Sequence, residues 1–121
     1  MREIKFRAWD KEEKKLFEVA RIDFADNTVY RHLFNCEGYL GEDLNLMQYT
    51  GLKDKNGVEI YEGDIFWSDH SGEYTYVEYQ EGAFYIIHTV TSEKTLLSKE
   101  HGDWIIRGNI YENPELLEGL K

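Results

Sequence analysis

Short runs of apolar and aromatic residues, separated by glycine, asparagine and aspartate, recur along the whole chain. These runs are EIKFRAW, LFEVARIDF, TVYRHLF, DIFWS, YTYVEY, AFYIIHT and WIIRGNI. Apolar residues rarely recur at the spacing of an amphipathic helix, whereas short β-branched and aromatic runs bounded by turn residues are typical of strands. The pattern predicts a mainly β protein with antiparallel strands, built as a barrel-like or two-layer β-sheet.

The C-terminal segment YENPELLEGLK departs from this pattern and predicts a short helix. Asn113 can cap the helix, Pro114 suits its first position, and Glu115 complements the positive end of the helix dipole. The segment SEKTLLSKEHG, residues 92–102, fits either a short helix or a loop.

The stretch GLKDKNGVEIYEGDIF predicts a structural turn. A two-residue loop at Asn56 and Gly57 would place Asp54 opposite Glu59, and facing like charges destabilise a sheet. We therefore expect a type I turn over residues 54–57 with Gly57 in the left-handed conformation, which places Lys53 opposite Glu59.

The same register places Leu52 opposite Ile60. A calcium loop does not fit the stretch, because Leu52 and Gly63 stand where that loop needs carboxylates. We expect no metal here.

Turn chemistry further along the chain predicts one aromatic face. A turn at residues 69–72 and a hairpin with Glu81 and Gly82 at its tip bring Ile65, Val77 and Ile86 into one row on the core face. The opposite face then carries a candidate interaction surface made of Phe66, Tyr74, Tyr76, Tyr85 and Ile87. An open aromatic patch often marks an interaction site, and the alternative is cover by the N-terminal strands of the same chain.

Composition narrows the class of protein. A chain of 121 residues with 41% hydrophobic residues predicts one folded domain over residues 1–121. Lys and Arg number 14 against 24 Asp and Glu, and the net charge of −10 argues against nucleic-acid binding. Cys36 stands alone, and no long apolar run is present, so we expect no disulfide, no membrane span and a cytoplasmic location.

Candidate chemistry is sparse. His32 and Cys36 have an i, i+4 spacing, but nothing completes a metal site. Cys36 could act as a nucleophile with His32, His70 or His101, and the spacing selects none of them. Asp64 and Asp69 flank a strand and could act as paired carboxylates, but such pairs arise by chance in an acidic protein. His88 is expected to be a hydrogen-bonded core histidine. We therefore assign no catalytic residue, no cofactor and no metal ligand.

Three blocks together are more specific than any single motif. They are REIKFRAWDKEEKKL, LMQYTGLKDKNGVEIYEGDIF and GNIYENPELL. In order and spacing the chain resembles the YopX family of small phage- and prophage-encoded proteins. The resemblance implies a small β-rich protein acting inside a bacterium, and it carries no established activity. Arg107 stands where the resemblance implies an aliphatic residue.

The leading hypothesis is a non-enzymatic accessory protein that binds a host or phage protein in the bacterial cytoplasm, with self-association into a homo-oligomer left open. Binding to nucleic acid or to a membrane is not expected. One alternative is a small hydrolase or nucleotide-processing enzyme whose site is assembled only in the fold. Another is an acidic mimic of nucleic acid.

Overall fold

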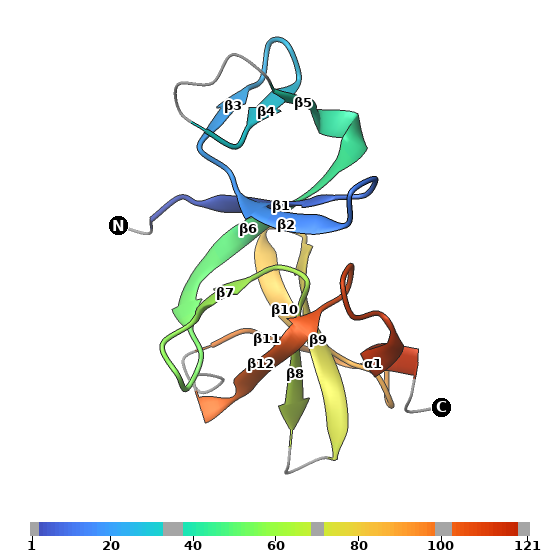
Figure 1. Cartoon of the computed structure of the whole chain (residues 1–121). Coiled ribbons are helices and arrows are strands. Elements are labelled where there is room, and N and C mark those ends of the chain that lie inside the picture. The colour runs from blue at the N-terminus through green and yellow to red at the C-terminus, as the bar shows by residue number, and fades with distance from the viewer. Residues whose placement is uncertain (1–2, 33–37, 69–71, 99–102, 119–121) are drawn as a thin grey trace. The chain divides into compact units, whose positions relative to one another are not determined.

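The computed structural model describes residues 3–32, 38–68, 72–98 and 103–118 (Figure 1). Its strands are β1 (Phe6–Asp10), β2 (Lys15–Glu18), β3 (Arg21–Asp23), β4 (Thr28–Tyr30), β5 (Tyr39–Leu40), β6 (Leu44–Lys53), β7 (Glu59–Tyr61), β8 (Asp64–Ser68), β9 (Glu73–Gln80), β10 (Ala83–His88), β11 (Lys94–Leu96) and β12 (Ile105–Asn109). A 3₁₀ turn, η1 (Gly41–Asp43), precedes β6, and one short helix, α1 (Glu115–Glu118), follows β12. The prediction of a mainly β protein with antiparallel strands and a short C-terminal helix is confirmed.

The chain divides into two compact units within β6. The first unit contains Glu3–Gln48 and the second contains Tyr49–Lys121. The expectation of a single domain over residues 1–121 stays a prediction. The first half of β6 pairs with β1 in the first unit, and Tyr49 and Lys53 in its second half pair with β7 in the second.

The first unit holds a small core between two hairpins. β1 pairs with both β2 and β6, and β4 pairs with both β3 and β5. Ala8, Phe17, Val29 and Leu44 form a buried cluster, and the Phe17 ring stacks on Tyr39 with 5.0 Å between ring centroids.

The second unit is built around a five-stranded sheet in the order β11-β10-β9-β8-β12. Its core cluster brings Ile60 of β7 against Phe66, Val77, Phe84 and Ile86 of the sheet. The apolar side chains of one face of this sheet are thus covered by the β6–β7 hairpin, giving this unit two layers.

The turn after β6 has the predicted form. Lys53 lies opposite Glu59, and the Gly57 amide donates to the carbonyl of Asp54 at 3.0 Å. Gly57 has a φ of 79°, so the expected left-handed position is occupied by the residue that tolerates it. The turn also contacts the sheet, because the Lys55 amide donates to the carbonyl of Trp104 at 3.0 Å.

The predicted β9–β10 hairpin is confirmed as well. Val77 lies opposite Ile86, and Ala83 lies opposite Gln80, which leaves Glu81 and Gly82 at the tip. Both tip residues have positive φ, 48° for Glu81 and 86° for Gly82, as a type I′ turn requires.

The predicted register between β8 and β9 is wrong by one residue. Ile65 lies opposite Tyr76 instead of Val77, because the loop closes with Ser68 opposite Glu73. The Gly72 amide donates to the carbonyl of Ser68, four residues back. A shift of one residue exchanges the two faces of a strand. The shift therefore moves Phe66 from the aromatic face into the core.

The C-terminal segments fold partly as predicted. The Asn113 side chain does not cap α1 in the predicted way; its Oδ1 accepts from the Asn109 amide at 3.3 Å. The segment at residues 92–102, which fitted a helix or a loop, contains the short strand Lys94–Leu96 paired with β10, with non-regular residues on both sides and no helix within its described residues 92–98. The expected turn at residues 69–72 and the candidates Cys36, Asp69, His70 and His101 lie wholly or partly outside the described residues.

Candidate functional site

A patch of half-buried aromatic side chains occupies the face of the five-stranded sheet opposite the core. We call it the tyrosine face and define it by Trp67, Tyr74, Tyr76, Tyr85 and Ile87. Strand pairing brings these residues together, since Trp67 lies opposite Tyr74 and Tyr76 lies opposite Ile87. Four of the five residues of the predicted interaction surface are therefore on one face.

Phe66 does not belong to this face. Its side chain is 0% exposed, packs in the core cluster, and meets the Trp104 ring edge-on at 5.8 Å between centroids. Trp67 takes its place, with its ring 4.8 Å from that of Tyr74 in a T-shaped contact. Sequence patterning missed Trp67 because three consecutive apolar residues, Ile65 to Trp67, leave the alternation of β8 ambiguous.

Charged side chains border the tyrosine face. The Lys94 ammonium group lies 4.8 Å from the centre of the Tyr85 ring, and it also donates to Gln80 Oε1 at 3.3 Å. Burial raises the pKa of Tyr76, and the nearby carboxylate of Glu78 raises it further. The face thus combines apolar rings, hydroxyl groups and a cation, which is the mixture common at protein interfaces.

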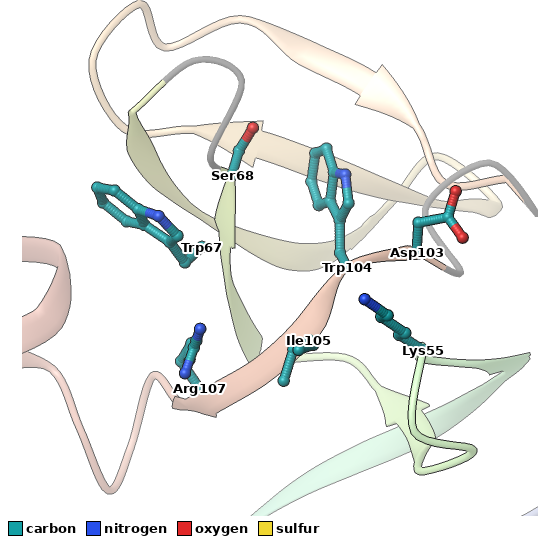
Figure 2. Close-up of a pocket in the computed structure, with 7 residues that line it drawn as sticks. All are labelled: Lys55, Trp67, Ser68, Asp103, Trp104, Ile105 and Arg107. Atoms are coloured by element: carbon teal, nitrogen blue, oxygen red, sulfur yellow. The ribbon is translucent and has the colours of Figure 1, made fainter.

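A pocket of about 200 Å³ opens at the edge of the same sheet, beside β12 (Figure 2). Its apolar lining comes from Trp67 of β8, from Trp104 immediately before β12, and from Ile105 of β12. Ile105 lies opposite Trp67 in the strand register, so these two side chains share one side of the sheet. The pocket therefore adjoins the tyrosine face and shares Trp67 with it.

The polar lining of the pocket holds more positive than negative charge. Lys55, Arg107, Asp103 and Ser68 contribute it, with formal charges of +1, +1, −1 and 0 that sum to +1. In the described part of the chain no side-chain hydrogen bond or ion pair engages Lys55, Arg107 or Asp103. In Figure 2 the carboxylate of Asp103 points away from the Lys55 ammonium group.

Two local structures place the cations beside the pocket. Lys55 lies in the turn after β6, and the buried carboxylate of Asp54 fixes that turn to β12 by accepting from the Ile106 amide at 3.2 Å. Arg107 falls at a register shift between Ile106 and Gly108, where β12 bulges against β8. A bulge redirects a side chain and relieves it of packing, which explains an exposed arginine where an aliphatic residue is expected.

A chain of hydrogen bonds joins an acid, a histidine and a hydroxyl at one end of the core face. The buried carboxylate of Glu73 lies 2.6 Å from His88 Nδ1, and His88 Nε2 lies 3.2 Å from Thr95 Oγ1. His88 is thus bonded through both ring nitrogens, as expected of a satisfied histidine, although it is half-buried rather than fully enclosed. Thr75, opposite His88, is fully buried and its hydroxyl has no partner within the described structure.

Within the described residues, the other candidate catalytic and metal-binding residues do not form a common site. Asp64 is buried and its Oδ2 accepts from the Tyr61 amide at 2.8 Å, which gives it a structural part in the turn between β7 and β8. His32 is exposed. Within residues 3–32, 38–68, 72–98 and 103–118 no group of histidine, cysteine and acidic residues could hold a metal ion. Over the same ranges, no helix has the length and apolar character needed to span a membrane.

Comparisons with known proteins cover nearly the whole chain. A family model described as YopX protein matches residues 5–118. The structure is similar to that of protein EF1440 from Enterococcus faecalis, with 29% identity, a TM-score of 0.72, and coverage of 97% of this chain and 99% of that one. It is also similar to protein YopX from Bacillus subtilis, with 22% identity, a TM-score of 0.66, and coverage of 97% and 98%, a likeness that concerns the fold alone. No curated protein matches the chain.

Proposed function

The chain belongs to the YopX family, and from this membership and its tyrosine face we propose that it is a phage- or prophage-encoded accessory protein that binds another protein in the bacterial cytoplasm. The proposed partner is a host or phage protein. The proposed mechanism is non-enzymatic: the tyrosine face supplies the contact, and the bound partner is blocked or redirected.

The observation that carries this proposal is the half-exposed state of the tyrosine face. Trp67, Tyr74, Tyr76, Tyr85 and Ile87 are neither buried nor scattered; strand pairing holds them side by side on one sheet. Aromatic side chains on a rigid sheet lose little conformational freedom on binding, and Trp and Tyr are enriched among residues that dominate binding energy. A partner that covers these rings gains apolar contact area while the tyrosine hydroxyl groups stay in contact with water at the rim.

The substitution Tyr76→Glu tests the proposal, with Tyr79→Glu as the matched control. Both tyrosines lie on β9, but Tyr79 is 49% exposed and its side chain is on the opposite face, against Phe84. We expect Tyr76→Glu to remain folded and to lose partners in affinity capture from bacterial lysate at low and high salt, while Tyr79→Glu keeps them.

Other results of this experiment have clear meanings. Loss of cooperative urea unfolding in Tyr76→Glu would show that the face is internal core, and the proposal would fail. A lower mass by light scattering, without loss of other partners, would identify the partner as a second copy of the chain. A folded variant with unchanged mass and partners would show that the face binds nothing.

Nucleic acid is not the proposed partner. Binding to a polyanion is dominated by Lys and Arg contacts with phosphates, and the chain carries a net charge of −10. Fluorescence anisotropy with labelled single- and double-stranded oligonucleotides at physiological salt should show no saturable binding. Saturable binding in the micromolar range would contradict this expectation and would favour nucleic acid over a protein as the partner.

A hydrolase is the second candidate function, because the Glu73–His88–Thr95 chain has the order of acid, imidazole and hydroxyl used in nucleophilic catalysis. In such a site Thr95 Oγ1 would attack an ester carbonyl carbon while His88 takes its proton, and His88 would pass that proton to the alcohol that leaves as the ester C–O bond breaks. Water would then hydrolyse the acyl-threonine, releasing the carboxylic acid and restoring the Thr95 hydroxyl. None of the three residues lines the pocket beside β12. Hydrolysis of p-nitrophenyl acetate that disappears in both Thr95→Val and His88→Gln would favour this candidate; equal rates in all three proteins would remove it.

A further inference from the structure

We propose that the pocket beside β12 binds a small anion that carries one flat aromatic ring. This inference does not depend on the proposed partner protein. It rests on the two unpaired cations, the two tryptophans and the way in which the fold holds them.

The unpaired cations are the first observation. The chain has 24 acidic residues against 14 basic ones, so carboxylates that could form an ion pair outnumber the cations. Lys55 and Arg107 nevertheless line one pocket with no ion pair to Asp103 or to any other described residue. Two cations that line one pocket without a carboxylate partner favour the binding of an anion there. Arg can grip a carboxylate or phosphate through two parallel hydrogen bonds, while Lys adds a point charge.

The tryptophan side chains favour a ligand that contains an aromatic ring. Trp67 and Trp104 both line the pocket and each is only partly buried; the Trp104 ring also packs edge-on against Phe66 of the core cluster, whereas Trp67 lies on the tyrosine face. Indole faces attract flat rings by stacking and by edge-to-face contact. The volume of about 200 Å³ corresponds to roughly seven water molecules at about 30 Å³ each. Drug-sized ligands occupy pockets of about 300 Å³ or more, so a ligand with a single ring and one anionic group matches this pocket better than a dinucleotide.

The pocket is also held in place before any ligand arrives. The Lys55 amide donates to the Trp104 carbonyl at 3.0 Å, and Asp54 Oδ2 accepts from the Ile106 amide at 3.2 Å. These bonds attach the lysine-bearing turn to the strand that carries Arg107. A preformed arrangement reduces the entropy lost on binding, which is what a weakly enclosed site needs to bind a small ligand.

Titration of the ¹⁵N-labelled full chain with phenyl phosphate and with benzoate tests the proposal. The three tryptophans give three indole N–H signals, two from the pocket and one from Trp9 in the first unit, which serves as an internal control. Trp67→Phe and Trp104→Phe assign the signals. We expect saturable shifts of the Trp67 and Trp104 signals and none of Trp9. Inorganic phosphate and acetate lack the ring, and benzyl alcohol lacks the charge, so each should bind about tenfold more weakly or worse.

The variants separate a built site from general attraction. Lys55→Ala and Arg107→Ala should each weaken phenyl phosphate binding by about tenfold, the effect of losing one hydrogen bond to a charged group. Lys53→Ala is the control. Lys53 is exposed, lies two residues before Lys55 and does not line the pocket, so its loss should leave the affinity for phenyl phosphate unchanged.

Three results would overturn the proposal. They are the absence of saturable shifts at millimolar ligand, equal shifts of all three indole signals, and equal weakening by Lys53→Ala and Lys55→Ala. If binding is seen, the order of phenyl phosphate and benzoate decides between a phosphate-bearing and a carboxylate-bearing ligand. None of these results bears on Tyr76, so failure here leaves the proposed partner binding standing.

Discussion

Replacing Asp54 should destabilise the second unit more than its place in a surface turn implies. Its carboxylate is 6% exposed and accepts from three backbone amides: Oδ1 from Asn56 and Val58, both at 2.9 Å, and Oδ2 from Ile106 at 3.2 Å. Asp54→Ala leaves all three amides without this acceptor. Asn56 and Val58 are exposed, so water can replace the carboxylate there, whereas the Ile106 amide lies inside the contact between turn and strand.

The expected loss follows from these differences. An unsatisfied buried donor costs about 1–3 kcal/mol, and two hydrated local bonds cost about 0.5 kcal/mol each, which gives about 2–4 kcal/mol for Asp54→Ala. Asp54→Asn keeps Oδ1 but replaces Oδ2 by an amino group that cannot accept, so it should lose about 1–3 kcal/mol. With a urea dependence of about 1 kcal/mol per M, the unfolding midpoint of Asp54→Ala should fall by about 2–4 M.

Asp23→Ala is the matched control. Asp23 Oδ1 also accepts from two local amides, those of Ala25 at 3.0 Å and Asp26 at 3.2 Å, but these bonds are exposed and, within the described residues, the Asp23 carboxylate accepts from no distant strand. Asp23→Ala should therefore lose about 1 kcal/mol or less of unfolding free energy. Urea unfolding followed by circular dichroism measures all three variants. If Asp54→Ala loses no more stability than Asp23→Ala, the bond to Ile106 does not stabilise the fold and the reasoning is wrong.

Three further predictions follow from the second unit. Phe66→Ala should lose about 3–5 kcal/mol of unfolding free energy in urea titration, because the ring is fully buried in the core cluster; a loss below that of an exposed aromatic such as Tyr79→Ala would contradict its placement. Gly57→Ala should lower stability by about 1 kcal/mol from backbone strain alone, since a Cβ there meets no atom within 4 Å; an unchanged thermal melt would contradict the left-handed turn. The folded pKa of Tyr76 is raised by burial and by Glu78, so its contribution to stability is complete below the unfolded pKa of about 10 and is lost as the pH rises through the folded pKa. Tyr76→Phe, which cannot ionise, should therefore lose less stability than the wild type between pH 9 and the alkaline transition, and parallel pH profiles would contradict this.

Local turn chemistry allowed much of the fold to be predicted. The turn at Gly57 and the hairpin tip at Glu81 and Gly82 are determined by residues within a few positions of each other, and both have the predicted register. The short helix near Pro114 is another local feature. Four of the five predicted surface residues share a face because the β9–β10 register is correct.

The β8 register was beyond local patterning. Alternation favours an acid on the solvent side, yet Asp64 is buried because the Tyr61 amide lies 2.8 Å from its carboxylate. Asp64 and Phe66 are two residues apart on β8, so the buried carboxylate and the buried ring lie on the same face of the strand. The pocket was also unpredictable, because Lys55, Trp67 and Arg107 come from three segments that are brought together by the β8–β12 pairing and by hydrogen bonds from the turn at residues 54 and 55 to residues 104 and 106.

The position of β12 at the edge of the five-stranded sheet has a consequence for folding kinetics. β9 and β10 are neighbours in sequence and pair across a two-residue loop. β8 and β12, which pair at Asp64 and Asn109, are separated by a long segment of the chain. Because loop closure must precede such a contact, the pairing of β8 with β12 should be the late event in folding of this unit. Until then β8, with the sequence DIFWS, is an open edge strand whose unpaired amides and carbonyls can pair with another chain. Aggregation during expression should therefore increase with any substitution that delays the docking of β12, even one that leaves the folded state intact.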